Sequence, residues 1–320
     1  MALKTKFSDE ELIHILSHYE LGEFIHSEPC AGGTVQTNIV LYTTKGRYVF
    51  RYYENRKEGS VLFEVSLLSY LKDQQYPCPA PICKKDGGYI GVHQLKSFVL
   101  FEFMDGQHIS NPTMNQRKQL IQKAAELHNL TQHYVPVNRE DRLNYSMDLC
   151  RDLAHQASHR INTTEATEKF SWLEKELLQL QLPQSLPSGI CHADFHFSNV
   201  LYLNDEFHAL LDFDDANHTY LLYDLVGLIE SSAWRHDHDN ILDFAKARQV
   251  LSEYSKYRAL HSLEEMHLFD VYKLSILMDC VWYFDRGHVQ DFYEKRKIDF
   301  INAIGREQFN HQLFGSLSSH

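Results

Sequence analysis

The sequence predicts a two-lobed α+β fold, in which a small antiparallel-sheet lobe over residues 1–104 precedes a mainly helical lobe over residues 105–320. Three observations support this prediction. Runs of β-branched and aromatic residues, separated by turn signals, dominate the first hundred residues. Apolar residues recur at helical spacing after Gly106. A short β-rich segment over residues 189–214 interrupts these helices and carries many polar side chains.

The first lobe is expected to begin with a helix, because Ser8 and Glu11 form a capping box ahead of apolar residues at helical spacing. A β-hairpin is expected over residues 36–43 and 47–53, with its tight turn at Lys45-Gly46. The remaining elements are a helix over residues 58–73 with the apolar stripe Val61, Leu62, Val65, Leu68 and Leu71, a proline-rich extended segment over residues 76–81, and strands over residues 89–93 and 97–103.

The second lobe is expected to start after a hinge at residues 104–106. Helical periodicity predicts helices near residues 115–130, 144–158, 164–181, 220–234, 240–257, 263–286 and 289–304. Between the third and the fourth of these helices, apolar runs predict strands over residues 199–203 and 208–213.

Composition narrows the function classes. The net charge of −12 argues against a nucleic-acid binder, which needs basic residues to neutralise phosphates. The six scattered cysteines show no metal-ligand spacing and are typical of reduced thiols in a cytoplasmic protein. The most apolar run, over residues 275–284, is interrupted by Asp279, so no membrane span is expected.

The β-rich segment carries the pattern His192-x-Asp194-x4-Asn199, followed by Asp212 at the predicted end of an apolar strand. A carboxylate at such a position is expected to be buried, which costs several kcal/mol without a cation or hydrogen bonds. Phosphoryl transfer to an alcohol uses one carboxylate to accept the proton, and oxygen ligands to hold Mg²⁺ on the phosphates. The pattern therefore predicts Asp194 as the base, with Asn199 and Asp212 as magnesium ligands.

These motifs resemble those of the aminoglycoside phosphotransferase and choline kinase superfamily, which has a protein-kinase-like fold, and within it the protein-kinase-like homoserine kinases. The resemblance extends over essentially the whole chain. It includes residues 46–54, residues 77–82, the loop over residues 192–199, Asp212-Phe213, and Tyr223-Asp224-Leu225.

The resemblance implies ATP and Mg²⁺ as cosubstrate and metal. It implies that Gly32, Gly33 and the hairpin after them cover the nucleotide, and that backbone groups around Glu102 and Met104 hold the adenine. It also implies that Asp224 braces the catalytic loop.

One position departs from the kinase pattern, because Arg51 stands where kinases place a lysine on the third strand. The resemblance implies that Glu64 positions this cation. Arginine keeps the charge but binds phosphate as a bidentate fork. Two interpretations stay open for Arg51, a phosphate ligand or one half of a structural ion pair.

The resemblance favours homoserine or a related amino alcohol as the small-molecule acceptor, with an aminoglycoside or another antibiotic hydroxyl as the alternative. An amino acid's carboxylate calls for a cation, for which Arg235 and Arg286 are candidates. A polyamine calls for carboxylates, for which Asp214, Asp215, Asp237 and Asp239 are candidates. The acceptor's identity, the kinetic order and the oligomeric state are not determined by the sequence.

Two hypotheses from other classes are also considered. His192, Asp194 and His196 have the spacing of metal ligands in hydrolases, which suggests a metal-dependent phosphoesterase, but this leaves Asn199 and Asp212 without a role. A non-catalytic, nucleotide-binding pseudokinase is supported only by Arg51.

Overall fold

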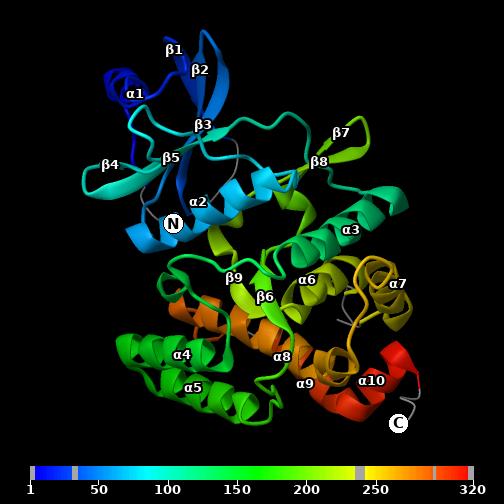
Figure 1. Cartoon of the computed structure of the whole chain (residues 1–320). Coiled ribbons are helices and arrows are strands. Elements are labelled where there is room, and N and C mark those ends of the chain that lie inside the picture. Colours follow the sequence, from blue (N-terminus) through cyan, green and yellow to red (C-terminus); the bar gives the residue numbers. More distant parts are fainter. Residues whose placement is uncertain (1–3, 31–34, 235–241, 291–292, 316–320) are drawn as a thin grey trace. The chain divides into compact units, whose positions relative to one another are not determined.

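The computed structural model describes residues 4–30, 35–234, 242–290 and 293–315. The backbone divides into two compact units (Figure 1). Unit 1 consists of residues 1–111, 134–142 and 198–214, and unit 2 of residues 112–133, 143–197 and 215–320. The chain thus passes between the units several times, and the functional division expected after residue 104 stays a prediction.

Unit 1 is built around an antiparallel sheet of five strands in the order β1-β2-β3-β5-β4. Its elements are α1 (Asp9–Leu16), β1 (Phe24–Pro29), β2 (Thr37–Thr43), β3 (Gly46–Tyr52), α2 (Glu58–Asp73), β4 (Gly91–His93), β5 (Lys96–Glu102), η1 (Arg139–Asp141), β7 (Val200–Leu203) and β8 (Glu206–Leu210). Strands β7 and β8 form a separate hairpin in this unit.

Several predicted elements of unit 1 are confirmed. The capping box of Ser8 and Glu11 starts α1, and Thr43 pairs with Gly46 across the predicted β2–β3 turn. Helix α2 has the predicted bounds, but Leu62 of the predicted stripe is exposed, whereas Phe63 is fully buried. Helix α2 therefore buries more of its surface than a single apolar stripe would.

The core of unit 1 packs α1 against one face of the sheet. Leu12 of α1, Leu41 of β2 and Phe50 of β3 have no exposed surface. Burying each such side chain stabilises the fold by roughly 1.5–3 kcal/mol. This core holds β3 rigidly, and β3 carries Arg51.

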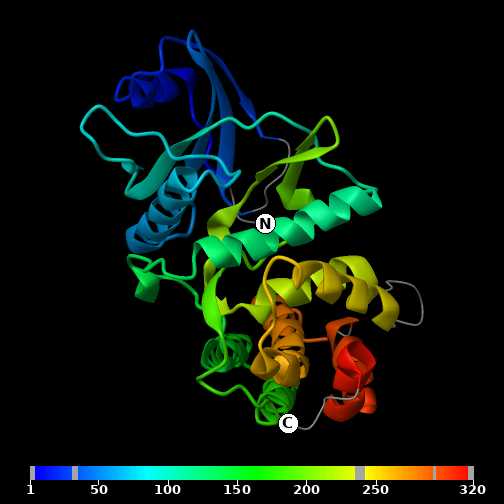
Figure 2. The same cartoon turned by 45° about the vertical axis from the view of Figure 1, so that its right-hand side comes forward.

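Unit 2 is mainly helical. Its elements are α3 (Met114–Leu130), α4 (Met147–Ile161), α5 (Thr164–Leu177), β6 (Ser188–Cys191), β9 (Asn217–Tyr220), α6 (Leu222–Ala233), α7 (Phe244–Tyr254), α8 (Ser262–Asp285), α9 (Tyr293–Ile304) and α10 (Arg306–Phe314). The long helix α8 packs against α4, α5, α6, α9 and α10, as the two views show (Figures 1 and 2). All the helices predicted for this region are confirmed, while α10 and the β6–β9 pair were not predicted.

The predicted strand over residues 208–213 is too long. Strand β8 ends at Leu210, Asp212 has a φ of 61°, and a 3₁₀ turn, η3 (Phe213–Asp215), follows. The expectation that Asp212 is buried at a strand end is wrong, because its side chain is 43% exposed. The apolar run continues past the strand because Phe213 is buried in the 3₁₀ turn.

Within the described residues, no helix has both the length and the apolar character needed to cross a membrane.

Candidate active site

Arg51 links three elements of unit 1. Its Nη1 donates to Glu64 Oε1 of α2 at 3.0 Å, and its Nη2 donates to Asp212 Oδ1 at 3.1 Å. Its Nε donates to Asn38 Oδ1 at 3.0 Å, because Asn38 and Arg51 are paired neighbours on β2 and β3. The predicted contact between Arg51 and Glu64 is therefore present, and the same guanidinium also holds Asp212.

The charges around Arg51 reinforce one another. Burial alone would lower the pKa of Arg51, but Asp212 and Glu64 outweigh it and raise the pKa. Burial raises the pKa of Glu64, and the charge of Arg51 opposes this shift. The Tyr53 hydroxyl donates to Glu64 Oε2 at 3.0 Å, so both carboxylate oxygens have partners.

The two predicted magnesium ligands flank the open end of the β7–β8 hairpin. Val200 pairs with Leu210, and the Leu211 N–H donates to the Asn199 carbonyl at 2.7 Å. Asn199 and Asp212 thus lie on neighbouring segments of one hairpin end. The positive φ of Asp212 turns the chain sharply away from the strand direction at this point.

The backbone after β5 is joined to the same hairpin. The Gln107 N–H donates to the Tyr202 carbonyl at 2.9 Å, and the Tyr202 N–H donates back at 3.0 Å. Gly106 is required here, since its φ is 131° and a Cβ would come within 3.0 Å of the Tyr202 carbonyl oxygen. Met104 therefore lies three residues before Gln107, which is bonded to the hairpin that follows Asn199.

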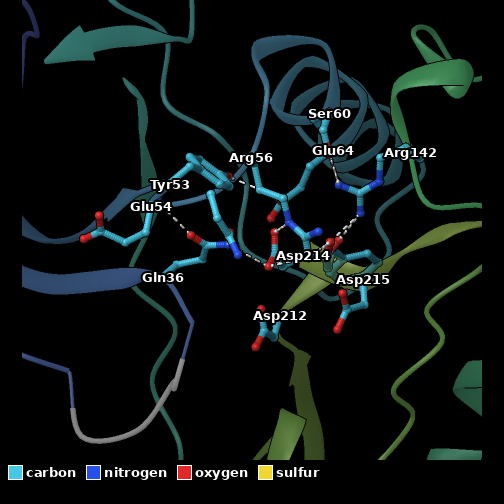
Figure 3. Close-up of polar contacts among 12 residues, drawn as sticks. Gln36, Tyr53, Glu54, Arg56, Ser60, Glu64, Arg142, Asp212, Asp214 and Asp215 are labelled. Atoms are coloured by element: carbon cyan, nitrogen blue, oxygen red, sulfur yellow. Dashed lines mark hydrogen bonds and ion pairs between the residues drawn. The ribbon is translucent and has the colours of Figure 1, made fainter. Parts of the chain in front are cut away.

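Asp214 is buried and fully paired (Figure 3). Arg56 donates from Nε to Oδ1 at 3.0 Å and from Nη2 to Oδ2 at 2.9 Å, and Gln36 Nε2 donates to Oδ2 at 2.9 Å. Burial would raise the pKa of Asp214, but Arg56 outweighs it and lowers the pKa. An acceptor could reach this carboxylate only by displacing Arg56 or Gln36.

Arg142 clamps the backbone of the same turn. Its Nη2 donates to the carbonyls of Phe213 at 3.1 Å and Asp214 at 2.7 Å. Its Nη1 donates to the carbonyl and hydroxyl of Ser60, at 3.2 and 2.9 Å, and its guanidinium lies 4.8 Å from the Phe63 ring centre. Figure 3 shows Arg142 between α2 and the turn that follows Asp212.

Sequence reasoning missed Arg56 and Arg142. Both lie in irregular segments, and neither has a characteristic spacing to the pattern at residues 192–214. Their partners are 158 and 71–72 residues away in sequence, so only the folded backbone brings them together.

In unit 2, Asp224 braces the loop that carries Asp194, as expected. Its carboxylate accepts the N–H of His192 at 2.8 Å and that of Ala193 at 2.7 Å. Ala193 has a φ of 64°, and the Asp194 N–H lies 3.3 Å from His192 Nδ1. The Asp194 side chain is exposed, while Asp224 beneath it is buried.

The phosphoesterase hypothesis is not supported by the described part of the chain. There, the metal-donor atoms of His192, Asp194 and His196 do not gather, and the group that does is His128, Cys191 and Asp224. Asp224 already accepts the loop amides and contacts His128 Nε2 at 3.0 Å, so this buried group is a structural network. Burial raises the pKa of the Cys191 thiol well above its usual value, which fits its interpretation as a packed residue.

The residues expected to contact the nucleotide differ in their hydrogen bonding. The Glu102 carboxylate pairs with Lys72 at 2.9 Å, and the Glu102 N–H donates to the Ala80 carbonyl at 2.9 Å. Met104 follows the end of β5, and no other described residue hydrogen-bonds to its backbone. Gly32 and Gly33 lie outside the described residues.

Only some of the residues expected to contact the acceptor lie within the described part of the chain. Arg286 follows α8, is exposed, and stacks with its guanidinium 5.9 Å from the Tyr283 ring centre. Arg235, Asp237 and Asp239 lie outside the described residues.

Comparison with known proteins shows the family to which the chain belongs. The profile of the phosphotransferase enzyme family matches residues 26–260. The homoserine kinase of Rhodospirillum rubrum is 31% identical over 267 residues, which cover 82% of this chain and 81% of that protein. The homoserine kinase of Chelativorans sp. is 32% identical over 262 residues, which cover 81% of this chain and 80% of that protein.

Solved structures support the fold. An amicoumacin kinase in complex with AMP-PNP and Ca²⁺ superposes with a TM-score of 0.68 at 15% identity, covering 93% of each chain. The chain therefore belongs to the phosphotransferase enzyme family, with the kinase-like α+β fold, and is a kinase that phosphorylates a hydroxyl group of a small molecule.

Proposed function

We propose that this kinase transfers the γ-phosphate of ATP, with Mg²⁺, to the hydroxyl of homoserine or a related amino alcohol. The homoserine kinases among its relatives support this acceptor class. One observation in unit 1 carries the proposal. At the end of the β7–β8 hairpin, Asn199 lies beside the segment that contains Asp212, and Arg51 donates a hydrogen bond to Asp212.

Asn199 and Asp212 would hold the magnesium ion. Their amide and carboxylate oxygens are the ligands that Mg²⁺ prefers. Asp212 is 43% exposed, and within the described residues only its Oδ1 is bonded, which leaves Oδ2 for a metal. The ion would neutralise the charge of the transferring phosphate, and Asp194 would accept the proton of the attacking hydroxyl.

Arg51 is proposed as a phosphate ligand as well as a positioning residue. A guanidinium has five N–H donors. In the described structure three of them bond to Asn38, Glu64 and Asp212, so two remain for phosphate oxygens. Glu64 of α2 orients the guanidinium of Arg51, and for this reason we assign Glu64 to the nucleotide site.

Residues 1–104 are proposed to cover the nucleotide, with Gly32 and Gly33 over the phosphates and the backbone at Glu102 and Met104 beside the adenine. The unbonded backbone of Met104 supports this role, since adenine recognition needs an available donor and acceptor. Residues 105–320 would supply the catalytic loop and the acceptor pocket, to which Arg235 and Arg286 are assigned as candidates, whereas Asp214 would first have to lose Arg56 or Gln36. The six cysteines, all among the described residues, form no disulfide, which fits the proposed cytoplasmic location.

The hydroxyl of an aminoglycoside or of another antibiotic is the second candidate acceptor. The observation that favours it is the exposed carboxylate of Asp279. Burial raises the pKa of Asp279, and the nearby charge of Asp194 adds to this rise, so we place Asp279 on the acceptor side of unit 2. A polyamine would exploit this negative potential as readily as an amino alcohol.

The proposal is tested by following γ-phosphate transfer from ATP with Mg²⁺ to homoserine, other amino alcohols, choline-like alcohols and aminoglycosides. Asp194→Asn is expected to abolish transfer, and Asp148→Asn, a matched change at an exposed carboxylate, is expected to retain it. Nucleotide binding without turnover of any acceptor would instead indicate a pseudokinase.

A further inference from the structure

Asp279 is an exposed carboxylate in a buried helix. Its neighbours on α8, Met278 and Cys280, are buried, whereas Asp279 is exposed. Among the residues that the structure describes, none forms a hydrogen bond or an ion pair with its carboxylate. A charge of this kind in a surface helix would be ordinary, but α8 packs against α4, α5, α6, α9 and α10.

The residues around Asp279 form one helical face. Between Val271 and Trp282, the residues of α8 that are not buried are Ser275, Asp279 and Trp282. They are spaced by four and three residues, so they lie in one row along the helix. Over this stretch, the row is the part of α8 that is not buried.

Aromatic rings flank this row. The Tyr145 ring centre lies 5.2 Å from that of Tyr223 and 6.3 Å from that of Trp282. Helix α6, which carries Tyr223, packs against α8, which carries the row. Aromatic faces attract cations, and most strongly the face of tryptophan.

The charges that face Asp279 are mainly negative. Glu230 of α6, Asp194 of the catalytic loop and Lys297 of α9 act on it electrostatically. Lys297 is paired with Glu230, which also accepts from the Tyr272 hydroxyl. Lys297 and Glu230 are therefore paired with each other, and within the described residues the carboxylate of Asp279 has no ion-pair partner.

Protein surrounds Asp279 densely although solvent reaches it. Burial, reinforced by Glu230 and Asp194, raises the pKa of Asp279 to about 7, against the opposing charge of Lys297. A cation that arrives with the substrate would stabilise the charged form of this carboxylate.

We propose that Asp279 binds the protonated amine of the acceptor, with Trp282 and Tyr145 flanking it, and so restricts the kinase to amine-bearing alcohols. This inference rests on the proposed function, because it places the amine beside the site at which Asp194 receives the hydroxyl. A metal ion is a poorer occupant, since Asp279 belongs to no cluster of donor groups in the described residues.

The test compares the wild-type enzyme with Asp279→Asn and with Asp299→Asn. Asp299 is a matched control, because it is an exposed carboxylate on α9 whose ion-pair partner within the described residues is Lys295 of its own helix. The acceptors are L-homoserine and 4-hydroxybutanoate, which is the same alcohol without its amine. If another acceptor of the panel is preferred, it is paired with its own deaminated analogue.

Asp279→Asn is expected to raise the KM for the amine-bearing acceptor by about 10- to 100-fold, with little change in the KM for ATP. The deaminated analogue is expected to react equally poorly with the wild type and with Asp279→Asn. Asp279→Glu is expected to restore part of the lost affinity, and Asp299→Asn to behave as the wild type. A KM change below twofold, or an equal change for both acceptors, would overturn the proposal.

Calorimetry without ATP separates this inference from the proposed function. If no acceptor is phosphorylated but amines bind to the wild type and not to Asp279→Asn, the amine site stands and the kinase proposal fails. If only amine-free alcohols are phosphorylated, the kinase stands and the amine site fails. If no amine of the panel binds to the wild type, the amine site is likewise overturned.

Discussion

Arg51 and Asp212 are 161 residues apart in sequence and are joined by a hydrogen bond of 3.1 Å from Nη2 to Oδ1. The same guanidinium reaches Glu64 of α2 at 3.0 Å. Strand β3, helix α2 and the turn after β8 are thus connected through one planar group. A displacement of α2 within unit 1 would therefore be transmitted through Arg51 to Asp212, the proposed magnesium ligand.

Replacing Arg51 with lysine should therefore be costly even though the charge is kept. A lysine is a single ammonium and does not reproduce the fork that reaches Glu64 and Asp212 together. We expect Arg51→Lys to lower kcat/KM for ATP by about 10- to 100-fold, as removal of a charged hydrogen bond does. Steady-state kinetics at several Mg²⁺ concentrations measure this effect. Arg47→Lys is the control, since Arg47 pairs with Asp105 at the exposed surface. Equal activity of Arg51→Lys and the wild type would contradict the role assigned to Arg51.

Arg142 should matter mainly for stability. Its removal leaves the carbonyls of Phe213 and Asp214, and Ser60, without their buried donor. We expect Arg142→Met to lower the free energy of unfolding by about 2–4 kcal/mol. Urea unfolding measures this, with Arg139→Met at an exposed position of η1 as the control. A loss below 0.5 kcal/mol, roughly the scatter of surface changes, would show that the clamp is not needed.

The pair of Asp214 and Arg56 predicts a pH dependence of stability. The pKa of Asp214 is lowered in the folded protein, chiefly because Arg56 outweighs the effect of burial. A lowered carboxyl pKa stabilises the fold above the unfolded pKa, and this stabilisation is lost as the pH falls through the folded pKa. The wild type should therefore lose more unfolding free energy than Asp214→Asn between pH 6 and pH 3. At neutral pH, Asp214→Asn should be less stable by roughly 2–4 kcal/mol, because Arg56 loses its buried partner. Parallel pH profiles for the two proteins would refute the pairing.

For Asp279 we expect a pH dependence of stability of the opposite sign. Its pKa is raised to about 7, first by burial and then by Glu230 and Asp194. A raised carboxyl pKa means that stability falls as the pH rises from the usual aspartate value toward 7. We expect Asp279→Asn to melt a few degrees above the wild type at pH 8 and to match it near pH 4. Thermal melts across this range measure the difference, and a variant that is less stable at pH 8 would disprove the assignment.

The same ionisation should appear in catalysis. Only the charged form of Asp279 attracts an ammonium group, so the KM for an amine-bearing acceptor should fall as the pH rises from 6 to 8, around the pKa of about 7. Asp279→Asn should not show this fall. The titrating groups near Asp279 are Asp194, Glu230 and Lys297, and only a change that disappears in Asp279→Asn counts as evidence.

Local patterns account for what was predictable from the sequence. The capping box of Ser8 and Glu11, the tight turn at Gly46 and the bounds of α2 depend on neighbours within a few residues. Strand β1 (Phe24–Pro29) was missed because most of its residues are exposed, so it has no buried alternation to detect. The same exposure explains why its pairing with β2 becomes visible only in the folded sheet.

Long-range contacts account for what was not predictable. Asp212 was expected to be buried because an apolar run surrounds it, but the chain turns at its positive φ and buries Asp214 instead. Arg56 and Arg142 acquire their roles only when α2 and the turn after β8 meet. The pattern at Asp194 was recognisable because the chemistry of phosphoryl transfer requires those residue types at that spacing.

The central claim is that Asp194 receives the proton of an acceptor hydroxyl while that hydroxyl attacks the γ-phosphate of ATP. Phosphorus NMR of the full chain with ATP, Mg²⁺ and L-homoserine tests it most directly. We predict a phosphomonoester signal that grows as ADP forms with the wild type and is absent with Asp194→Asn, although that variant still binds ATP. A phosphomonoester formed at the wild-type rate by Asp194→Asn would contradict the account.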